Sequence, residues 1–85
     1  MMKEWLVTFR SVTFAQRGER AMQKHGIHCM LQRSPKAISQ RGCGYCLRLR
    51  DQDAIRAVGI LQKEQLAYEK VYVMTEDGGM EERLL

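Results

Sequence analysis

The chain has 85 residues, of which 45% are hydrophobic and 28% are charged, and its formal net charge is +4. This length suits one domain with one small core and excludes a second domain. No apolar run approaches the about 20 residues of a membrane-spanning helix, and the opening residues lack the long apolar stretch of a secretory signal. Three cysteines do not match a disulfide framework, so we expect a cytoplasmic protein with free thiols and no contact with membranes.

The hydrophobic pattern of the N-terminal half predicts two strands and a helix. All of residues 5–9 are apolar except Thr8, so apolar side chains would point to both sides of an extended segment. This pattern predicts a strand buried on both faces. Ser11 is a suitable N-cap for a helix over residues 12–25, and Gly26 is a suitable C-terminal stop. Alternation over residues 27–31 predicts a second strand, which is followed by a long polar loop over residues 32–42.

The C-terminal half predicts two further strands and a second helix. Residues 45–50 alternate between apolar and mostly cationic side chains, so Arg48, Arg50 and Cys46 should share one face of a third strand. Asp51 is the predicted cap of the second helix, and Val71 and Val73 mark the last strand. The residues expected to form the inward stripe of that helix are Ala54, Ile55, Val58, Leu61 and Leu66.

This element order, βαββαβ, predicts an α+β protein with a ferredoxin-like fold. Such a fold has a four-stranded antiparallel sheet with both helices on one face, and its helix-free face is open for binding. We expect residues 1–74 to form the single domain. Residues 75–85 lack clear periodicity and contain four acidic residues, so they are predicted to form a mobile acidic tail.

Cys43 is the leading candidate for chemistry. Gly42 and Gly44 flank it, which leaves the sulfur uncrowded and the backbone free to adopt unusual conformations. Nearby cations can stabilise a thiolate, which is the reactive form of cysteine. The alternative is that Cys43 only occupies a tight turn whose shape is set by its glycines and by Pro35.

Cys46 completes a Cys-x-x-Cys spacing with Cys43 and could act as a resolving thiol. In redox proteins this motif opens a helix, whereas here it leads into a strand pattern, so an ordinary strand residue is an equal interpretation. A zinc site would need Cys29 or His28 as well, and the paired motif typical of such sites is missing. With no P-loop or nucleophile elbow either, we expect no metal and no cofactor.

Basic residues surround the cysteine motif and could hold an anion, because guanidinium groups pair with phosphate and carboxylate. Half of this set could equally be a solvated surface. Nucleic acid is not the expected ligand, since the predicted sheet lacks an exposed pair of stacking aromatic residues. The candidate anion-binding residues are Arg10, Arg33, Lys36, Arg41 and Arg48.

Three segments give the chain a resemblance to a known family. They are WLVTFRSVTFAQRGER at the start, IHCMLQRSPKAIS in the middle, and the Cys43-Gly44 pair that leads into a strand with Arg48. Over about Trp5 to Tyr72, the chain resembles the selenium/sulfur carrier protein-like family. The resemblance implies that Cys43 accepts a sulfane sulfur or selenium atom and holds it as a persulfide or selenopersulfide.

Such a carrier is an accessory protein rather than a stand-alone enzyme. The resemblance implies a donor, for instance a cysteine desulfurase, and a downstream enzyme that accepts the sulfur or selenium. The alternative function is a non-catalytic binding or regulatory module. It would use the basic sheet face and loop to hold an anionic ligand or a protein partner, in a homodimer built through sheet edges.

Overall fold

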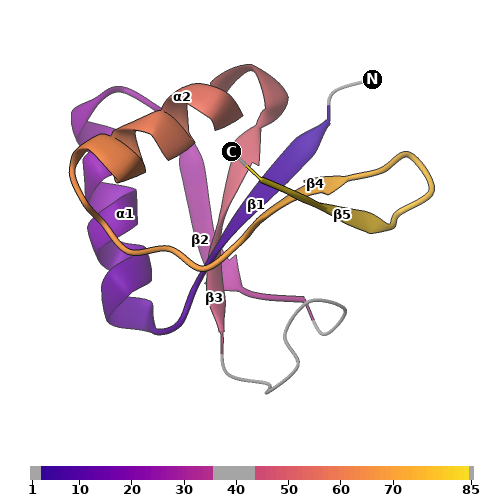
Figure 1. Cartoon of the computed structure of the whole chain (residues 1–85), viewed down its shortest axis with the longest axis horizontal. Coiled ribbons are helices and arrows are strands. Elements are labelled where there is room, and N and C mark those ends of the chain that lie inside the picture. The colour runs from indigo at the N-terminus through magenta and orange to yellow at the C-terminus, as the bar shows by residue number, and fades with distance from the viewer. Residues whose placement is uncertain (1–2, 36–43, 85) are drawn as a thin grey trace.

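An antiparallel sheet of five strands forms the centre of the molecule, and two helices cover one of its faces (Figure 1). The computed structural model of the chain describes residues 3–35 and 44–84. In chain order, the elements are β1 (Glu4–Phe9), α1 (Val12–Lys24), β2 (Cys29–Arg33), β3 (Tyr45–Arg50), α2 (Asp51–Lys63), β4 (Val71–Met74) and β5 (Met80–Arg83).

The strands lie in the order β2-β3-β1-β4-β5, so the first strand of the chain is central. All four neighbouring pairs are antiparallel. The predicted α+β class, with two helices and an antiparallel sheet, is confirmed. The predicted number of four strands is wrong, because the described residues form five.

The additional strand, β5, lies within residues 75–85, for which the sequence predicts an acidic tail. Its sequence is Met-Glu-Glu-Arg, which has no apolar alternation and therefore gave no strand signal. A tight turn brings β5 back onto β4: the amide of Thr75 donates to the carbonyl of Gly79 at 2.8 Å. Gly78 adopts a φ of 86° in this turn, a conformation that glycine tolerates best.

Both ends of α1 follow from its sequence. The Ser11 hydroxyl accepts a hydrogen bond from the Phe14 amide at 3.4 Å, as an N-cap does. At the other end, Gly26 adopts a φ of 72°, and the amide of Ile27 donates to the carbonyl of Met22 at 2.8 Å. This arrangement satisfies carbonyl groups that the helix end would leave unpaired. The predicted helix boundaries are therefore confirmed to within one residue.

The start and the buried face of α2 differ from the expectation. Asp51 is the first helical residue rather than the cap, and its carboxylate accepts a hydrogen bond from the indole of Trp5 at 2.7 Å. Ile55 is 69% exposed and does not face the core. Leu66 lies beyond the end of the helix. The buried face consists of Ala54, Ala57, Val58 and Leu61.

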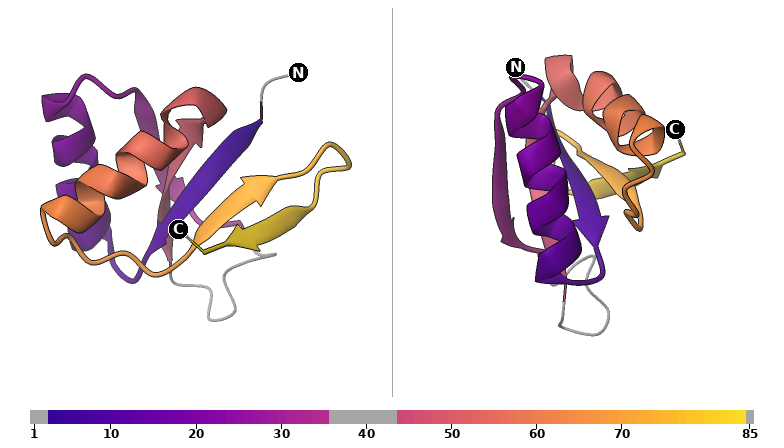
Figure 2. Two further views of the ribbon diagram at one scale, coloured as in Figure 1. Left: turned by 45° about the horizontal axis from the view of Figure 1, so that its top comes forward. Right: turned by 90° about the vertical axis from the view of Figure 1, so that its left-hand side faces the viewer.

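Close packing between α1 and the sheet sets the main core. A β-carbon added at Gly18 would lie 2.9 Å from Cζ of Phe9 and 3.1 Å from Cδ1 of Leu47, so glycine lets the helix approach the sheet. Both Phe9 and Leu47 are fully buried. Figure 2 shows the two helices side by side over the same face of the sheet.

Candidate functional site

The ends of three strands meet where the chain enters and leaves residues 36–43. Tyr45, at the start of β3, is paired with Phe9 of β1 and with Arg33 of β2. Just beyond them, the amide of Ser34 donates to the carbonyl of Gly44 at 3.0 Å. The two flanks of the Cys43 segment are therefore joined at one end of the sheet. We call this region, Ser34 with Gly44 and Tyr45, the loop base.

Four of the predicted site residues lie outside the described part of the chain. They are Lys36, Arg41, Gly42 and Cys43. Their neighbours Pro35 and Gly44 belong to the described residues and flank them at the loop base. The structure thus places both attachment points of the cysteine segment.

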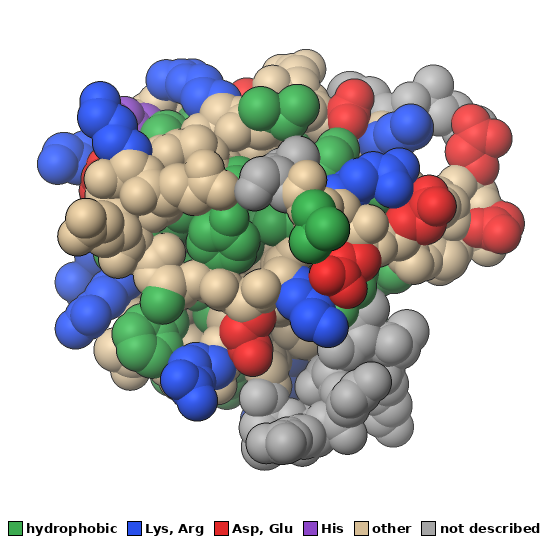
Figure 3. All heavy atoms as spheres, in the orientation of Figure 1, with side chains coloured by type: hydrophobic (Ala, Val, Ile, Leu, Met, Phe, Trp, Pro, Cys, Tyr) green, Lys and Arg blue, Asp and Glu red, His purple; other side chains and the backbone are tan. Residues whose placement is uncertain are grey.

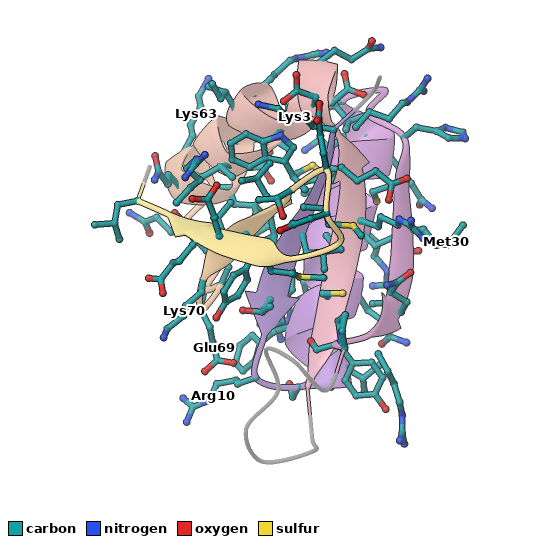
Figure 4. All side chains as sticks on the ribbon, turned by 90° about the vertical axis from the view of Figure 1, so that its right-hand side faces the viewer. Lys3, Arg10, Met30, Lys63, Glu69 and Lys70 are labelled. Atoms are coloured by element: carbon teal, nitrogen blue, oxygen red, sulfur yellow. The ribbon has the colours of Figure 1, made fainter. Side chains whose placement is uncertain are left out.

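Two of the predicted cations lie at the same end of the sheet as the loop base. Arg33 is the last residue of β2, and Arg10 directly follows β1; both are exposed. Glu69 and Lys70 project from this end together with Arg10 (Figure 4). The Arg33 and Arg10 side chains are accessible to an anion, although an acidic side chain shares the surface with them.

Arg48 and Arg50 lie on the helix-free side of β3, as the alternation predicted, but each has an acidic neighbour. The guanidinium of Arg48 donates two hydrogen bonds to one carboxylate oxygen of Glu4. Nε of Arg50 lies 4.0 Å from a carboxylate oxygen of Asp53. These pairings neutralise much of the basic face. Sequence reasoning missed Glu4, which is 44 positions from Arg48 and becomes its neighbour only through strand register.

The Cys46 thiol faces away from the helices but is fully buried. Its sulfur lies 4.0 Å from the backbone carbonyl oxygen of Arg33, to which it donates. Burial raises the pKa of the Cys46 thiol. The Ser34 and Gln32 side chains and the charge of Arg48 lower this pKa, but by less than burial raises it. In this conformation Cys46 is a shielded thiol near the loop base.

Cys29, the first residue of β2, is partly buried beside the main core. Burial, with a smaller contribution from the negative charge of Glu19, raises the pKa of this thiol to about 11. A thiol with so high a pKa is almost entirely protonated near neutral pH and is a poor nucleophile. Both described cysteines are therefore unsuited to act as the reactive thiol in this conformation.

A hollow of about 730 Å³ lies at the opposite end of β1 from the loop base. Lys3, Glu81 and Arg83, together with Asp77 in the turn before β5, contribute charged groups of both signs to its lining. The mixture of charges gives no preference for one ion. Its remaining lining residues are Val73, Met74, Thr75, Glu76, Gly79 and Met80.

Neither a metal centre nor a membrane span is found in the parts of the chain that the structure describes. Within residues 3–35 and 44–84, no three His, Cys, Asp or Glu side chains are grouped so that they could hold a metal ion. The helices in those ranges are too short or too polar to cross a bilayer.

Comparison with known proteins gives the family of the chain. The model of the family described as "Putative Se/S carrier protein-like" matches residues 4–73. The chain belongs to this family. No curated protein and no solved structure matched it. The match to the Se/S carrier-like family begins with β1 and ends within β4, so β5 lies outside the part of the chain that defines membership.

Proposed function

We propose that this chain is a cytoplasmic carrier that holds sulfur or selenium on Cys43. One observation carries the assignment of the thiol: Cys46 is buried, Cys29 is partly buried and both have raised pKa values, which favours Cys43 as the candidate nucleophile. Membership of the Se/S carrier-like family supports sulfur or selenium as the cargo. The exposed Arg10 and Arg33, at the end of the sheet where the loop base lies, provide positive charge for an anionic persulfide.

Loading would proceed by transfer from a donor persulfide, such as that of a cysteine desulfurase. The Cys43 thiolate attacks the outer sulfur of the donor, a new S–S bond forms, and the bond between the two donor sulfurs breaks. The donor cysteine leaves as a thiolate, so no outside oxidant or reductant is needed. A nucleophile of the acceptor enzyme then takes the outer sulfur from Cys43 in the same way. A selenium atom would follow the same sequence.

We further infer that the first four strands and both helices form a ferredoxin-like core, to which β5 is added. The order β2-β3-β1-β4, with its two crossovers through helices, supports this interpretation. In that arrangement, the described flanks of the Cys43 segment are joined at one end of the sheet, where Arg33 pairs with Tyr45 and the Ser34 amide donates to the Gly44 carbonyl.

The test is to load the protein with a purified cysteine desulfurase and L-cysteine and to map the added sulfur by peptide mass spectrometry. Trypsin leaves Cys43 and Cys46 in one peptide, residues 42–48, whereas cleavage after Tyr45 separates them; Cys29 falls in residues 25–33. We expect one added sulfur on the peptide with Cys43. Loading should be lost in Cys43→Ser and retained in Cys29→Ser.

The control variant distinguishes a specific carrier from general thiol reactivity. If Cys29→Ser loses loading as well, or if the added sulfur is found on Cys46, then Cys43 is not the acceptor. Equal loading of the native protein and Cys43→Ser would also overturn the proposal. A Cys46→Ala variant tests the resolving role separately, because it should still load but would release sulfur more slowly if Cys46 takes part.

A further inference from the structure

The two edge strands of the sheet, β2 and β5, differ in how well they are protected against pairing with a strand of another molecule. In β5, three of the four residues are charged and exposed. Pairing two β5 strands about their centre would place Glu81 directly opposite Glu82 of the other copy, and like charges in that position are destabilising. Figure 3 shows several acidic side chains, with Lys or Arg side chains among them, at the end of the molecule that the β4–β5 hairpin forms. The β5 edge is therefore guarded by charge.

The β2 edge has none of these protections. Its sequence is Cys-Met-Leu-Gln-Arg, with a single charge at its last residue and no proline inside the strand. Met30 is 59% exposed and projects from the strand (Figure 4). In the right-hand view of Figure 2, β2 runs along the outer margin of the described structure, with no helix beyond it. Among the strands of residues 3–35 and 44–84, only β3 pairs with β2, so the outward backbone groups of β2 can pair with a further strand.

We propose that two copies of this chain associate through antiparallel pairing of their β2 strands, about a two-fold axis at Leu31. An antiparallel pair of identical strands satisfies two-fold symmetry, and a centre at Leu31 pairs all five residues of β2. The two sheets then continue as one. This inference concerns assembly alone and does not depend on sulfur transfer.

The side chains of β2 suit this register. On the helix-free face, Met30 lies opposite Gln32 of the second copy, which covers an exposed apolar group. On the helix-covered face, Leu31 meets its own copy and extends the apolar row formed by Leu31, Leu47 and Val7. Cys29 lies opposite Arg33 of the second copy, so no like charges face each other across the pair.

Electrostatics give the dimer a recognisable response to salt. Each copy carries a formal net charge of +4, so bringing two together costs repulsion that salt screens. Added salt should therefore strengthen β2 pairing. Contact between the basic helix α1 of one copy and the acidic hairpin of another would instead weaken as salt rises. The direction of the salt effect separates the two modes.

The first test is sedimentation of the whole chain over a wide range of concentrations, without any donor enzyme. We expect a monomer–dimer equilibrium. Met30→Lys should raise its dissociation constant at least about tenfold, because it places a charge in the interface. The matched control is Ile55→Lys, which changes an equally apolar, 69% exposed residue on α2 and should leave the equilibrium unchanged. A monomer at all concentrations, or equal effects of both variants, would overturn the proposal.

The second test fixes the register. Cross-strand β-carbons lie about 4.5–5.5 Å apart, close to the span of a disulfide. Under mild oxidation, Leu31→Cys should form a disulfide that joins the two introduced thiols, identified by peptide mass spectrometry. Ile55→Cys should not cross-link. Cross-linking through Met30→Cys in place of Leu31→Cys would exclude a two-fold axis at Leu31. Since these variants need no sulfur donor, their outcome is separate from that of the carrier proposal.

Discussion

The two faces of the sheet bury their side chains by different means. The helix-covered face is apolar and closely packed, with Phe9 and Leu47 against the bare backbone of Gly18. The helix-free face also buries Leu6 and Cys46, at 1% and 0% exposure, but they lie beside polar groups such as the Arg48–Glu4 pair. We infer that the covered face provides most of the stability, whereas the helix-free face can change its polar groups at little cost.

The largest effect should come from adding one methyl group to the covered face. Gly18→Ala places a β-carbon within 2.9 Å of Phe9, and such overpacking costs about 1–3 kcal/mol. Gly59→Ala is the matched control, because nothing lies within 4 Å of its β-carbon. At this position, the better helix propensity of alanine should raise the free energy of unfolding by about 0.5–1 kcal/mol. Chemical denaturation of both variants measures the free energies of unfolding.

Comparison of the two alanine variants removes the propensity gain that they share. The difference between their unfolding free energies then reports the cost of crowding alone. Equal stabilisation of both variants would mean that α1 does not approach the sheet as closely as the structure has it. The contrast between the two faces would then have to be abandoned.

Most of the fold could be predicted because its signals are local. Ser11 and Gly26 mark the ends of α1, and alternation marks β3. β5 could not be predicted, because its charged sequence becomes a strand only through pairing with β4. Helical spacing predicts Ile55 in the core, but Ala54 and Ala57 lie on the buried face of α2 with Val58 and Leu61, and Ile55 is exposed. Small apolar residues give a weaker hydrophobic signal than isoleucine, which explains the error.

For the described residues near the candidate site, the sequence predicted their position along the strands but not their charge pairing or burial. The sequence brings Arg33, Gly44 and Cys46 together within 14 positions, and the strand register keeps them at one end of the sheet. The pairing of Arg48 with Glu4 depends on the contact between β1 and β3, which spacing alone does not reveal. The burial of Cys46 likewise results from packing on a face that was expected to be open.

An intermediate effect concerns the reactivity of Cys29. Its pKa of about 11 lies above the value of 9.0 for an unperturbed thiol, so its alkylation rate should rise with a midpoint near pH 11. In the unfolded chain, the Cys29 thiol ionises at a lower pH than in the folded chain. The contribution of this thiol to the free energy of unfolding is therefore fully present below about pH 9 and is lost as pH rises towards 11. Glu19→Gln should lower the midpoint. Alkylation at monomeric concentrations, followed on the peptide of residues 25–33, measures it; a midpoint near 9 would contradict the burial of this thiol.

The smallest effect should come from the ion pair on the helix-free face. The side chains of Arg48 and Glu4 are 39% and 38% exposed, so water and salt screen their attraction. A double-mutant cycle with Arg48→Met and Glu4→Gln should give a coupling energy of about 0.2–1 kcal/mol that shrinks as salt is added. A coupling above about 2 kcal/mol that salt does not change would show a desolvated pair. The helix-free face would then contribute to stability as the covered face does, and its arginine would be held too tightly to serve an incoming anion.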